Sequence, residues 1–310
     1  MSRPEEDSRA WVPTPHSPAS SVATPGVEKC ASRTGRAGGT SAGNLRLITL
    51  LTDFGHQDPF VGMIKGVILG LCPGAGIVDL CHETPPYNIL GGSFLLQSAV
   101  RFFPAGTIHL AVVDPGVGGP RRPIVAVIDQ HVFVAPDNGL LSYPMADGRV
   151  QAVRAITASA FFLHPVSPTF HGRDVFAPVA AHLARGIPVE RLGPEVADAI
   201  RLDIPRAQRD ASGAVRGQVL WIDRFGNCIT NVTQQDLGTC GDGTGRGARI
   251  LLDGRPLGSV VRFFGEAGIG GAGAVIGNTG HLELFSNQGN LAREWEVTLG
   301  SSVYLVCARD

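Results

Sequence analysis

The sequence predicts two domains, an α/β N-terminal domain with a mainly parallel sheet flanked by helices and a smaller all-β, barrel-like C-terminal domain. Three observations lead to this prediction. The chain has 310 residues, more than one small domain usually contains. Over residues 45–200, short apolar runs alternate with segments of helical spacing. Over residues 201–310, short β-type runs are separated by glycines, which is typical of a small barrel or sandwich.

Residues 1–44 come before the first predicted strand and have a different composition. They are rich in Ser, Pro, Gly, Ala and Thr and lack apolar periodicity, which predicts a disordered leader. Arginines and serines are present as in a targeting peptide, but Glu5, Glu6 and Asp7 argue against that interpretation.

The α/β domain is predicted from strands and helices that follow one another along the chain. Such alternation implies βαβ units and a sheet that is buried on both faces. The strands are expected in LRLITLLTD (45–53), AGIVDLCH (75–82), TIHLAVVDPG (107–116) and PIVAVIDQHVFVAPDNG (123–139). The helices are expected in PFVGMIKGVILGLCPG (59–74), ILGGSFLLQSAVRFFPAG (89–106) and RDVFAPVAAHLARG (173–186).

The composition changes over residues 196–214, which are polar, contain a proline and resemble a domain linker. We therefore place the domain boundary at residue 200. No helix is expected beyond it. The β-type runs are RGQVLWIDRFGN (216–227), RILLDG (249–254), AVIGNTGHLELFSNQGN (274–290) and SSVYLVCARD (301–310).

Composition excludes several classes of partner. Hydrophobic residues make up 44% of the chain and charged residues 17%, as in a globular protein with an apolar core. The net charge is −1, and the sequence has no basic stripe with interleaved aromatics, so nucleic acid is not an expected partner. No apolar stretch approaches the ~20 residues needed to span a bilayer. The six cysteines form no C-x-x-C pair and no metal-type spacing, so free thiols in a cytoplasmic protein without a metal site are expected.

Familiar nucleotide-binding signatures are missing. Gly116 and Gly118 begin a G-x-G, but Arg121 occupies the place of the third glycine of the dinucleotide fingerprint. There is no P-loop and no G-x-S-x-G. DFG at 53–55 and HGRD at 171–174 are similar to two protein-kinase motifs. They occur in the reverse of the kinase order and no glycine-rich loop precedes them, so a kinase is excluded.

Three predicted strands end in a polar cluster with glycine, at DFGHQD (53–58), DPGVGGPR (114–121) and DNG (137–139). One such ending is an ordinary turn, but several at one edge favour a ligand site, because ligands bind beyond the carboxyl ends of parallel strands. His171 precedes a predicted helix, where it is either a packing residue or part of that site. WIDRFGNCITN (221–231) predicts a tight turn, for which Gly226 alone is sufficient. Phe225 and Asn227 in this turn would also suit a purine ring, which could stack on the aromatic side chain and hydrogen-bond to the amide.

Seven ordered segments resemble the S-adenosylmethionine hydrolase family, also called SAM hydroxide adenosyltransferase, which is related to fluorinase and chlorinase. The resemblance runs from about Leu45 to the C-terminus. It is carried by LLTDFGHQDPFVGMIKGVI, IVDLCHETPPY, AVVDPGVGGPRR, VAPDNGLLS, TFHGRDVFAPVAAHLARG, IDRFGNCITN and GHLELFSNQGN.

The resemblance implies that Asp114, Arg121 and His171 form a catalytic triad beside a nucleophilic water. In the halogenating relatives the Asp and His positions are tyrosines, and a small Ser or Gly follows the His position, where this chain has Gly172. The insertion that fluorinase carries before its Asn-Asn-Gly turn is missing. Hydrolysis of S-adenosyl-L-methionine to adenosine and L-methionine is therefore favoured; the alternatives are a SAM-dependent halogenase and a non-catalytic adenosyl-ligand sensor.

The expected chemistry is attack of a water or hydroxide oxygen on the ribose C5′, with neutral methionine as the leaving group. Arg121 cannot act as a base because a guanidinium stays protonated in proteins. Its expected role is to hold Asp114 and to stabilise developing hydroxide charge. The proton acceptor is His171, or His171 coupled to Asp114, and the sequence leaves that choice open.

The resemblance also implies substrate-binding roles. Asp53 would hold the ribose diol, Asp58 the methionine ammonium, and Tyr87 would pack beside the ribose and sulfonium. Gly172, in the place of the small residue of the halide pocket, is also counted among the substrate-binding residues. Phe225, Asn227 and Phe263 would contact adenine, while Asn278 and Thr279 replace the Asn-Ser or Ser-Arg pair that holds the methionine carboxylate. Asn88, in place of the usual Asp, is given no role. The family implies a homotrimer with sites between subunits, no cofactor and no metal.

Overall fold

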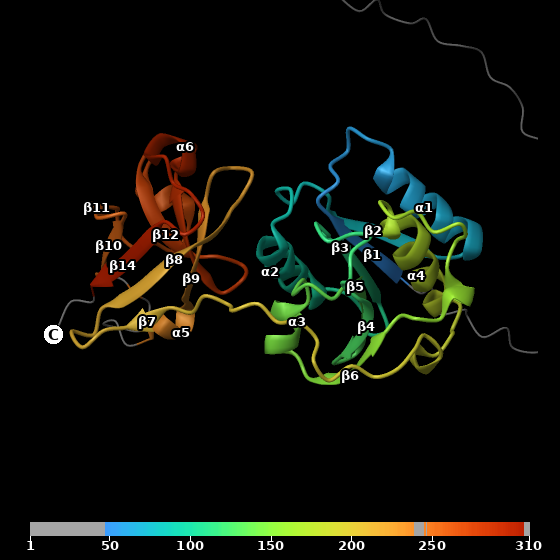
Figure 1. Ribbon diagram of the computed structural model, residues 1–310. Coiled ribbons are helices and arrows are strands. Elements are labelled where there is room, and N and C mark those ends of the chain that lie inside the picture. The colour runs from blue at the N-terminus through green and yellow to red at the C-terminus, as the bar shows by residue number, and fades with distance from the viewer. Residues whose placement is uncertain (1–46, 239–244, 246, 307–310) are drawn as a thin grey trace, which may run out of the picture. The chain divides into compact units, whose positions relative to one another are not determined.

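The computed structural model describes residues 47–238, 245 and 247–306, which form two sheets with separate hydrophobic cores (Figure 1). The predicted leader at 1–44 and the cysteines Cys30, Cys240 and Cys307 lie outside these residues. The three described cysteines, Cys72, Cys81 and Cys228, are free thiols. Within the described residues, no helix is long and apolar enough to cross a membrane.

The N-terminal sheet has six strands in the order β2-β1-β3-β5-β4-β6. Its central strands are parallel, since β1 pairs with β2 and β3, and β3 pairs with β5. The strands span Leu47–Thr52 (β1), Gly76–Cys81 (β2), Ile108–Val112 (β3), Pro123–Ile128 (β4), His131–Pro136 (β5) and Val150–Ala155 (β6).

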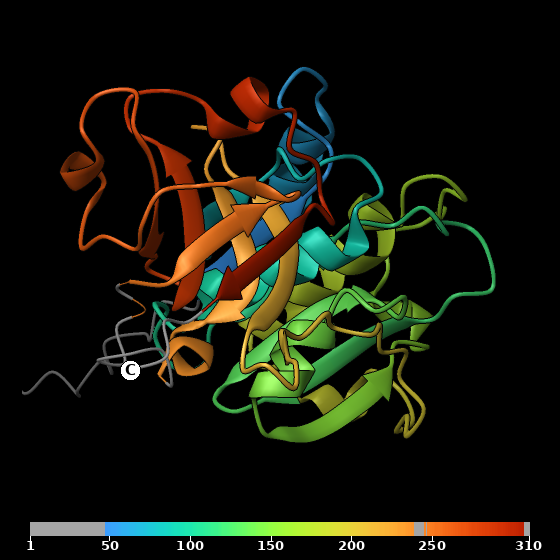
Figure 2. The same cartoon turned by 90° about the vertical axis from the view of Figure 1, so that its left-hand side faces the viewer.

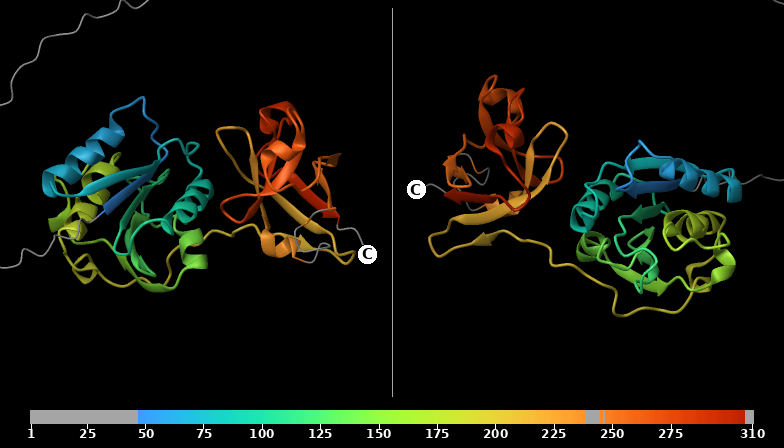
Figure 3. Two further views of the ribbon diagram at one scale, coloured as in Figure 1. Left: turned by 180° about the vertical axis from the view of Figure 1, so that it is seen from behind. Right: turned by 45° about the horizontal axis from the view of Figure 1, so that its top comes forward.

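Helices cover both faces of this sheet, as the continuous apolar strands predicted. α1 (Phe60–Leu71) and α4 (Ala177–Ala184) lie on one face, and α2 (Ile89–Val100) and α3 (Ser142–Asp147) on the other (Figures 1 and 3). Successive residues of one strand point to opposite cores: Leu50 packs with α1 and α4, and Leu51 with α2 and α3. Both side chains are fully buried.

The sheet contains both parallel and antiparallel strands. This corrects the expectation that it is built only from successive βαβ units. β4 runs antiparallel to both β5 and β6, and β6 was not predicted at all. β4 and β5 form a hairpin through Asp129 and Gln130, with Asp129 at φ +50°. An apolar run of strand length carries no information on strand direction, so the segment 123–139 could not reveal this reversal.

The C-terminal sheet is antiparallel and strongly curved (Figure 2). Its order is β11-β10-β14-β8-β9-β13-β12, with β7 beside β8, and the pairing does not close between β11 and β12. The strands are Gln208–Arg209 (β7), Val215–Ile222 (β8), Cys228–Thr233 (β9), Arg249–Leu252 (β10), Arg255–Pro256 (β11), Ala272–Ile276 (β12), His281–Ser286 (β13) and Ser302–Val306 (β14).

Two short helices, α5 (Gln234–Leu237) and α6 (Leu291–Trp295), contradict the expectation of no helix in this half. Both are single turns fixed by side-chain caps rather than by an apolar stripe. Thr233 and Asp236 form a capping box at α5, and Asn290 accepts the Arg293 N–H at α6. Helical periodicity cannot detect elements of this length.

The polar segment predicted as a linker has little regular structure up to β7, but it is anchored to the N-terminal half. Arg122 bridges Asp137 and Asp198, with N···O distances of 2.6 and 2.9 Å. The Leu202 N–H donates to Ser142 Oγ at 2.8 Å. The segment therefore follows the surface of the α/β half before entering β7; the domain boundary at residue 200 stays a prediction.

Candidate active site

The carboxyl ends of β1, β3 and β5 lie at one edge of the sheet, because these neighbouring strands are parallel. Asp53 follows β1, Asp114 follows β3 and Asp137 follows β5. Asp137 has a structural role there: its buried carboxylate accepts hydrogen bonds from Arg122 and from the Ile200 N–H at 2.8 Å. The polar clusters after β1 and β3 are therefore the ones available to a ligand.

Asp114, Arg121 and His171 meet in a continuous hydrogen-bonded chain. The Arg121 guanidinium donates two hydrogen bonds to the Asp114 carboxylate, one from Nε to Oδ1 at 2.9 Å and the other from Nη2 to Oδ2. Nη2 also lies 3.0 Å from Nδ1 of His171. The Arg121 and Asp114 side chains are only 9% and 4% exposed, so solvent screens this ion pair weakly.

This geometry assigns the protonation state of His171. Arg121 has no acceptor atom, so its contact requires a lone pair on Nδ1 and leaves the ring proton on Nε2. Burial, followed by the positive charge of Arg121, lowers the pKa of His171 below its usual value. The imidazole is therefore neutral at pH 7 and offers an N–H donor at Nε2.

A glycine allows the loop after β3 to approach the segment that carries His171. Gly118 has φ +77°, and a Cβ on it would lie 2.2 Å from the Pro168 carbonyl oxygen. No L-residue with a side chain fits that contact without moving the backbone. The loop 114–121 can thus lie directly against the strand-to-helix connection and place Arg121 beside His171.

His171 lies at the start of a π-helical turn, Gly172–Phe176, which continues into α4. Asp174 anchors this turn, since its fully buried carboxylate accepts from Arg173 Nε at 2.6 Å and from the Ser167 N–H at 2.8 Å. Wide turns of this kind occur often at functional sites, because they re-aim side chains at a helix end. Here the turn directs His171 toward Arg121.

A cavity of about 180 Å³ lies beside the triad, lined by Asp114, His171 and Gly172 together with three phenylalanines. Phe54, Phe60 and Phe170 contact one another edge to face, with ring centroids 5.3–6.0 Å apart. No sequence pattern predicted a role for these rings, although Phe54 follows Asp53 and Phe170 precedes His171. Their apolar wall strengthens electrostatic interactions in the cavity.

Asp53 and Tyr87 form a second predicted pair at the same sheet edge. The Tyr87 N–H donates to Asp53 Oδ2 at 2.9 Å, which leaves the other carboxylate oxygen available. The Tyr87 side chain is 72% exposed, and its backbone has φ +67°. Asp58 is exposed just before α1. None of these three residues lines the cavity beside His171.

The predicted adenine contacts belong to the C-terminal half. Asn227 donates to Asp223 Oδ2 at 3.0 Å across the tight turn that Gly226 permits at φ +84°. Phe225 and Phe263 are 72% and 56% exposed. Every residue that lines the cavity beside His171 lies between 54 and 172, so the described chain does not bring these side chains to it.

Asn278 and Thr279 lie in the connection from β12 to β13. The Asn278 carbonyl accepts a hydrogen bond from Arg101, the C-cap of α2, and Thr279 Oγ1 lies 3.2 Å from His281 Nδ1. Neither residue lines the cavity of the triad. The described residues also contain no cluster of three or more His, Cys, Asp or Glu side chains that could hold a metal ion.

Comparison with family models gives two matches in chain order. The SAM hydroxide adenosyltransferase N-terminal domain matches residues 48–193, and the C-terminal domain of the same family matches residues 217–304. A crystal structure of an uncharacterized conserved protein from Thermotoga maritima is similar, with a TM-score of 0.79 and 33% identity. It covers 84% of this chain and 100% of that one.

Several named enzymes are similar to this chain over most of its length. An (R)-S-adenosyl-L-methionine hydrolase from Thermus thermophilus is 38% identical over 266 residues, 81% of this chain and 95% of the relative. The enzyme of that name from Salinispora tropica is 37% identical, over 82% of this chain and 95% of the relative. A fluorinase from Nocardia brasiliensis is 30% identical, over 85% and 98%. The chain therefore belongs to the SAM hydroxide adenosyltransferase family.

Proposed function

We propose that this protein is an enzyme that hydrolyses S-adenosyl-L-methionine to adenosine and L-methionine. The observation that carries the proposal is the Asp114–Arg121–His171 chain at a small, largely aromatic cavity. The name of the relatives at 37–38% identity, (R)-S-adenosyl-L-methionine hydrolase, supports the same reaction.

In the proposed reaction, a water oxygen attacks the ribose C5′ and forms the new C–O bond while the C5′–S bond breaks. The sulfur takes the bonding pair and leaves as the thioether of methionine, so no acid is needed for the leaving group. The water loses one proton and becomes the 5′-hydroxyl of adenosine. The enzyme has to hold the oxygen in line with C5′ and to stabilise its developing negative charge.

The site geometry suggests a division of labour among the triad. His171 Nε2–H donates to the attacking oxygen, because Nδ1 is already used by Arg121. Asp114 accepts the water proton on a lone pair that Arg121 leaves free, since each carboxylate oxygen has two. Arg121 orients both groups and offsets the negative charge. This assignment favours Asp114 over His171 as the proton acceptor.

A halogenase is the second candidate, since fluorinases are also relatives. A halide needs no proton acceptor, whereas this cavity contains a carboxylate held by a buried guanidinium. Gly172 does provide a small residue, with Phe170 and Ile64 already 3.2–3.3 Å from the place of a Cβ. Incubation with fluoride or chloride is expected to give adenosine rather than a 5′-halo product.

We further propose that the enzyme is a cytoplasmic homotrimer that needs no cofactor or metal. Asp53, Asp58, Tyr87 and Gly172 would bind substrate from one subunit; Phe225, Asn227, Phe263, Asn278 and Thr279 would do so from its neighbour. Among the residues that the structure describes, those lining the cavity of the triad all belong to the N-terminal half, which is consistent with completion by another copy. Activity should be unaffected by a chelator, and loss of activity that a divalent ion restores would contradict metal independence.

The decisive experiment measures product formation and substrate affinity separately. Purified protein is incubated with S-adenosyl-L-methionine, and adenosine and methionine are quantified by chromatography. Asp114→Asn, Arg121→Lys and His171→Ala are expected to lower kcat by about 100-fold or more, because each removes one preorganised element beside the developing charge. Calorimetric affinity for substrate should change little.

The outcomes separate three interpretations. Near wild-type kcat in all three variants would contradict the catalytic assignment. Binding without turnover in the unmodified protein would indicate a sensor of adenosyl ligands. A fall in affinity that matches the fall in kcat would move the triad into the substrate-binding set.

A further inference from the structure

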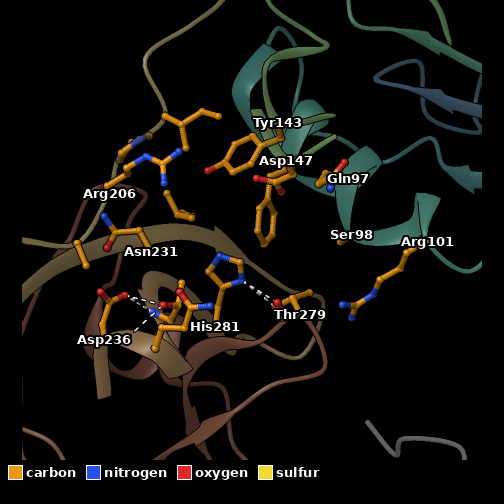
Figure 4. Close-up of a pocket in the computed structure, with 17 residues that line it drawn as sticks. Gln97, Ser98, Arg101, Tyr143, Asp147, Arg206, Asn231, Asp236, Thr279 and His281 are labelled. Atoms are coloured by element: carbon orange, nitrogen blue, oxygen red, sulfur yellow. Dashed lines mark hydrogen bonds between the residues drawn. The ribbon is translucent and has the colours of Figure 1, made fainter. Parts of the chain in front are cut away.

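A second cavity, of about 390 Å³, lies where α2 and α3 meet residues of the C-terminal sheet (Figure 4). It shares no lining residue with the cavity beside His171. Its buried part is formed by Phe94, Tyr143 and Asn231, with half-buried His281 next to them. The proposed hydrolysis uses none of these four side chains.

Tyr143 places an unsatisfied polar group in this cavity. The residue is 7% exposed, and its hydroxyl has no hydrogen-bond partner among the described residues. Its ring is fixed, because it packs edge to face on Phe94 with centroids 5.6 Å apart and its backbone N–H donates to Ser93 Oγ at 3.0 Å. A buried hydroxyl without a hydrogen-bond partner costs free energy, so we expect a bound molecule to supply a partner for it.

Asn231 and His281 add one donor and one acceptor. Asn231 Oδ1 accepts the Gln218 N–H at 2.7 Å, which leaves the amide NH₂ as a donor. His281 Nδ1 lies 3.2 Å from the Thr279 carbonyl, an acceptor only, so Nδ1 carries the proton. Burial lowers the pKa of His281, and the neutral ring therefore has a free lone pair on Nε2. Figure 4 shows that nitrogen on the side of the ring away from Thr279.

The charges around the cavity balance one another. Arg101 and Arg206 are offset by Asp147 and Asp236, and all four line its wall. An anion or a cation would therefore meet an equal number of like and opposite charges. The aromatic rings of Phe94, Tyr143 and His281 instead favour a flat, uncharged ring.

We propose that this cavity binds an uncharged nucleoside whose base has an amino donor next to a ring-nitrogen acceptor, as adenine and cytosine do. The amino group donates to His281 Nε2. The ring nitrogen accepts from the Tyr143 hydroxyl or the Asn231 amide. The base packs against the aromatic rings, and the ribose lies toward the charged wall.

The inference does not depend on the proposed function, although adenosine is a proposed product. If both hold, adenosine binds at two places in each chain. If hydrolysis fails, one adenosine per chain is still expected here, and its binding still depends on Tyr143. The two proposals can thus fail separately.

Isothermal titration calorimetry with adenosine tests the site in the intact protein. Tyr143→Phe keeps the ring and removes only the unpartnered hydroxyl, so one binding event should weaken by about tenfold. Phe225→Ala serves as the matched control, because it removes a predicted adenine contact of the active site and should leave this event unchanged. Purine riboside, which lacks the amino group, should also bind here about tenfold more weakly than adenosine.

Unchanged affinity and stoichiometry in Tyr143→Phe would overturn the proposal, as would a single binding event that only Phe225→Ala removes. Either result would mean that the cavity contains water only. Thermal unfolding of the variant checks that it is folded. The comparison of adenosine with purine riboside on the unmodified protein decides the matter if Tyr143→Phe does not fold.

Discussion

Gly118 is the residue on which the assembly of the triad depends most directly. Its positive φ and its closeness to the Pro168 carbonyl are two separate constraints. Gly106 provides a comparison, because it has φ +82° but nothing within 4 Å of a built Cβ. The two positions can therefore separate the cost of the backbone conformation from the cost of the collision.

Gly106→Ala should lower the free energy of unfolding by about 1–2 kcal/mol, the usual cost of a side chain in the left-handed region. Gly118→Ala should cost more than that, and it should also reduce kcat, because the loop must withdraw from the segment before His171. Denaturant unfolding and steady-state kinetics measure the two effects. Equal stability and equal kcat in the two variants would contradict the role of the close approach.

A buried histidine away from the site should control the response to acid. His109 is fully buried, bonds Thr49 at 2.7 Å and stacks on Phe133. Burial, and next the charge of His131, lowers the pKa of His109 from 6.5 to about 3. Between those values the unfolded chain takes up a proton that the folded chain does not, so stability is full above pH 6.5 and falls toward pH 3.

His109→Asn is expected to flatten this pH dependence, since asparagine does not titrate. Urea unfolding at several pH values between 3 and 7 gives the free energies for the variant and the unmodified protein. The other histidines with lowered pKa values contribute to both proteins equally, except His131, whose Nδ1 lies 3.3 Å from Nε2 of His109. Parallel curves for the two proteins would show that His109 is not a source of the acid sensitivity.

At the scale of elements, the start of α2 explains a residue for which the sequence offered no role. Asn88 is the N-cap of α2, and its side-chain oxygen accepts the Gly91 N–H at 2.8 Å. The aspartate that relatives carry in the Pro-Pro-x-Asp pattern is an equally good N-cap. The departure from that pattern therefore preserves a structural function.

Asn88→Ala should lower the free energy of unfolding by about 1 kcal/mol, whereas Asn88→Asp should keep it near that of the unmodified protein. The reason is that only the alanine variant leaves the Gly91 N–H without its side-chain acceptor. Chemical denaturation of the three proteins is sufficient for the comparison. An equal loss in both variants would mean that the amide NH₂ of Asn88, and not its oxygen, matters.

Most strands and the long helices could be predicted because their apolar pattern continues over a full element. β1 and α1, for example, lie inside the runs expected for them. The direction of β4, the strand β6 and the one-turn helices depend on turns, caps and partners that an apolar pattern does not encode. At the site, resemblance suggested the triad, but only the geometry shows that Arg121 occupies Nδ1 of His171.

At the scale of the whole molecule, the predicted binding residues divide between two halves of the chain. Asp114 and His171 line a cavity that no described residue beyond 172 lines, while Phe225 and Asn227 lie in the C-terminal half. If copies of the chain complete one another's sites, two inactive variants with lesions in different halves should restore activity when mixed.

We expect light scattering to give about three times the chain mass of 32.5 kDa. His171→Ala and the double variant Phe225→Ala/Asn227→Ala should each have low activity, and subunit exchange between them should produce sites with neither lesion. Adenosine formation after mixing, with each variant alone as the control, measures the effect. Activity that stays at the mean of the two parents would argue that each chain forms its own site.

The reversed strand β4 has a consequence for the order in which the sheet forms. The β4–β5 hairpin closes through only two residues, Asp129 and Gln130, whereas β1 and β3 pair residues 60 positions apart, such as Thr49 and His109. Closing a short loop costs less chain entropy than closing a long one. In pulsed hydrogen exchange during refolding, amides of the hairpin should therefore become protected before those of β1. The edge that carries Asp114 is completed only afterwards, so the newly made chain acquires its catalytic geometry late.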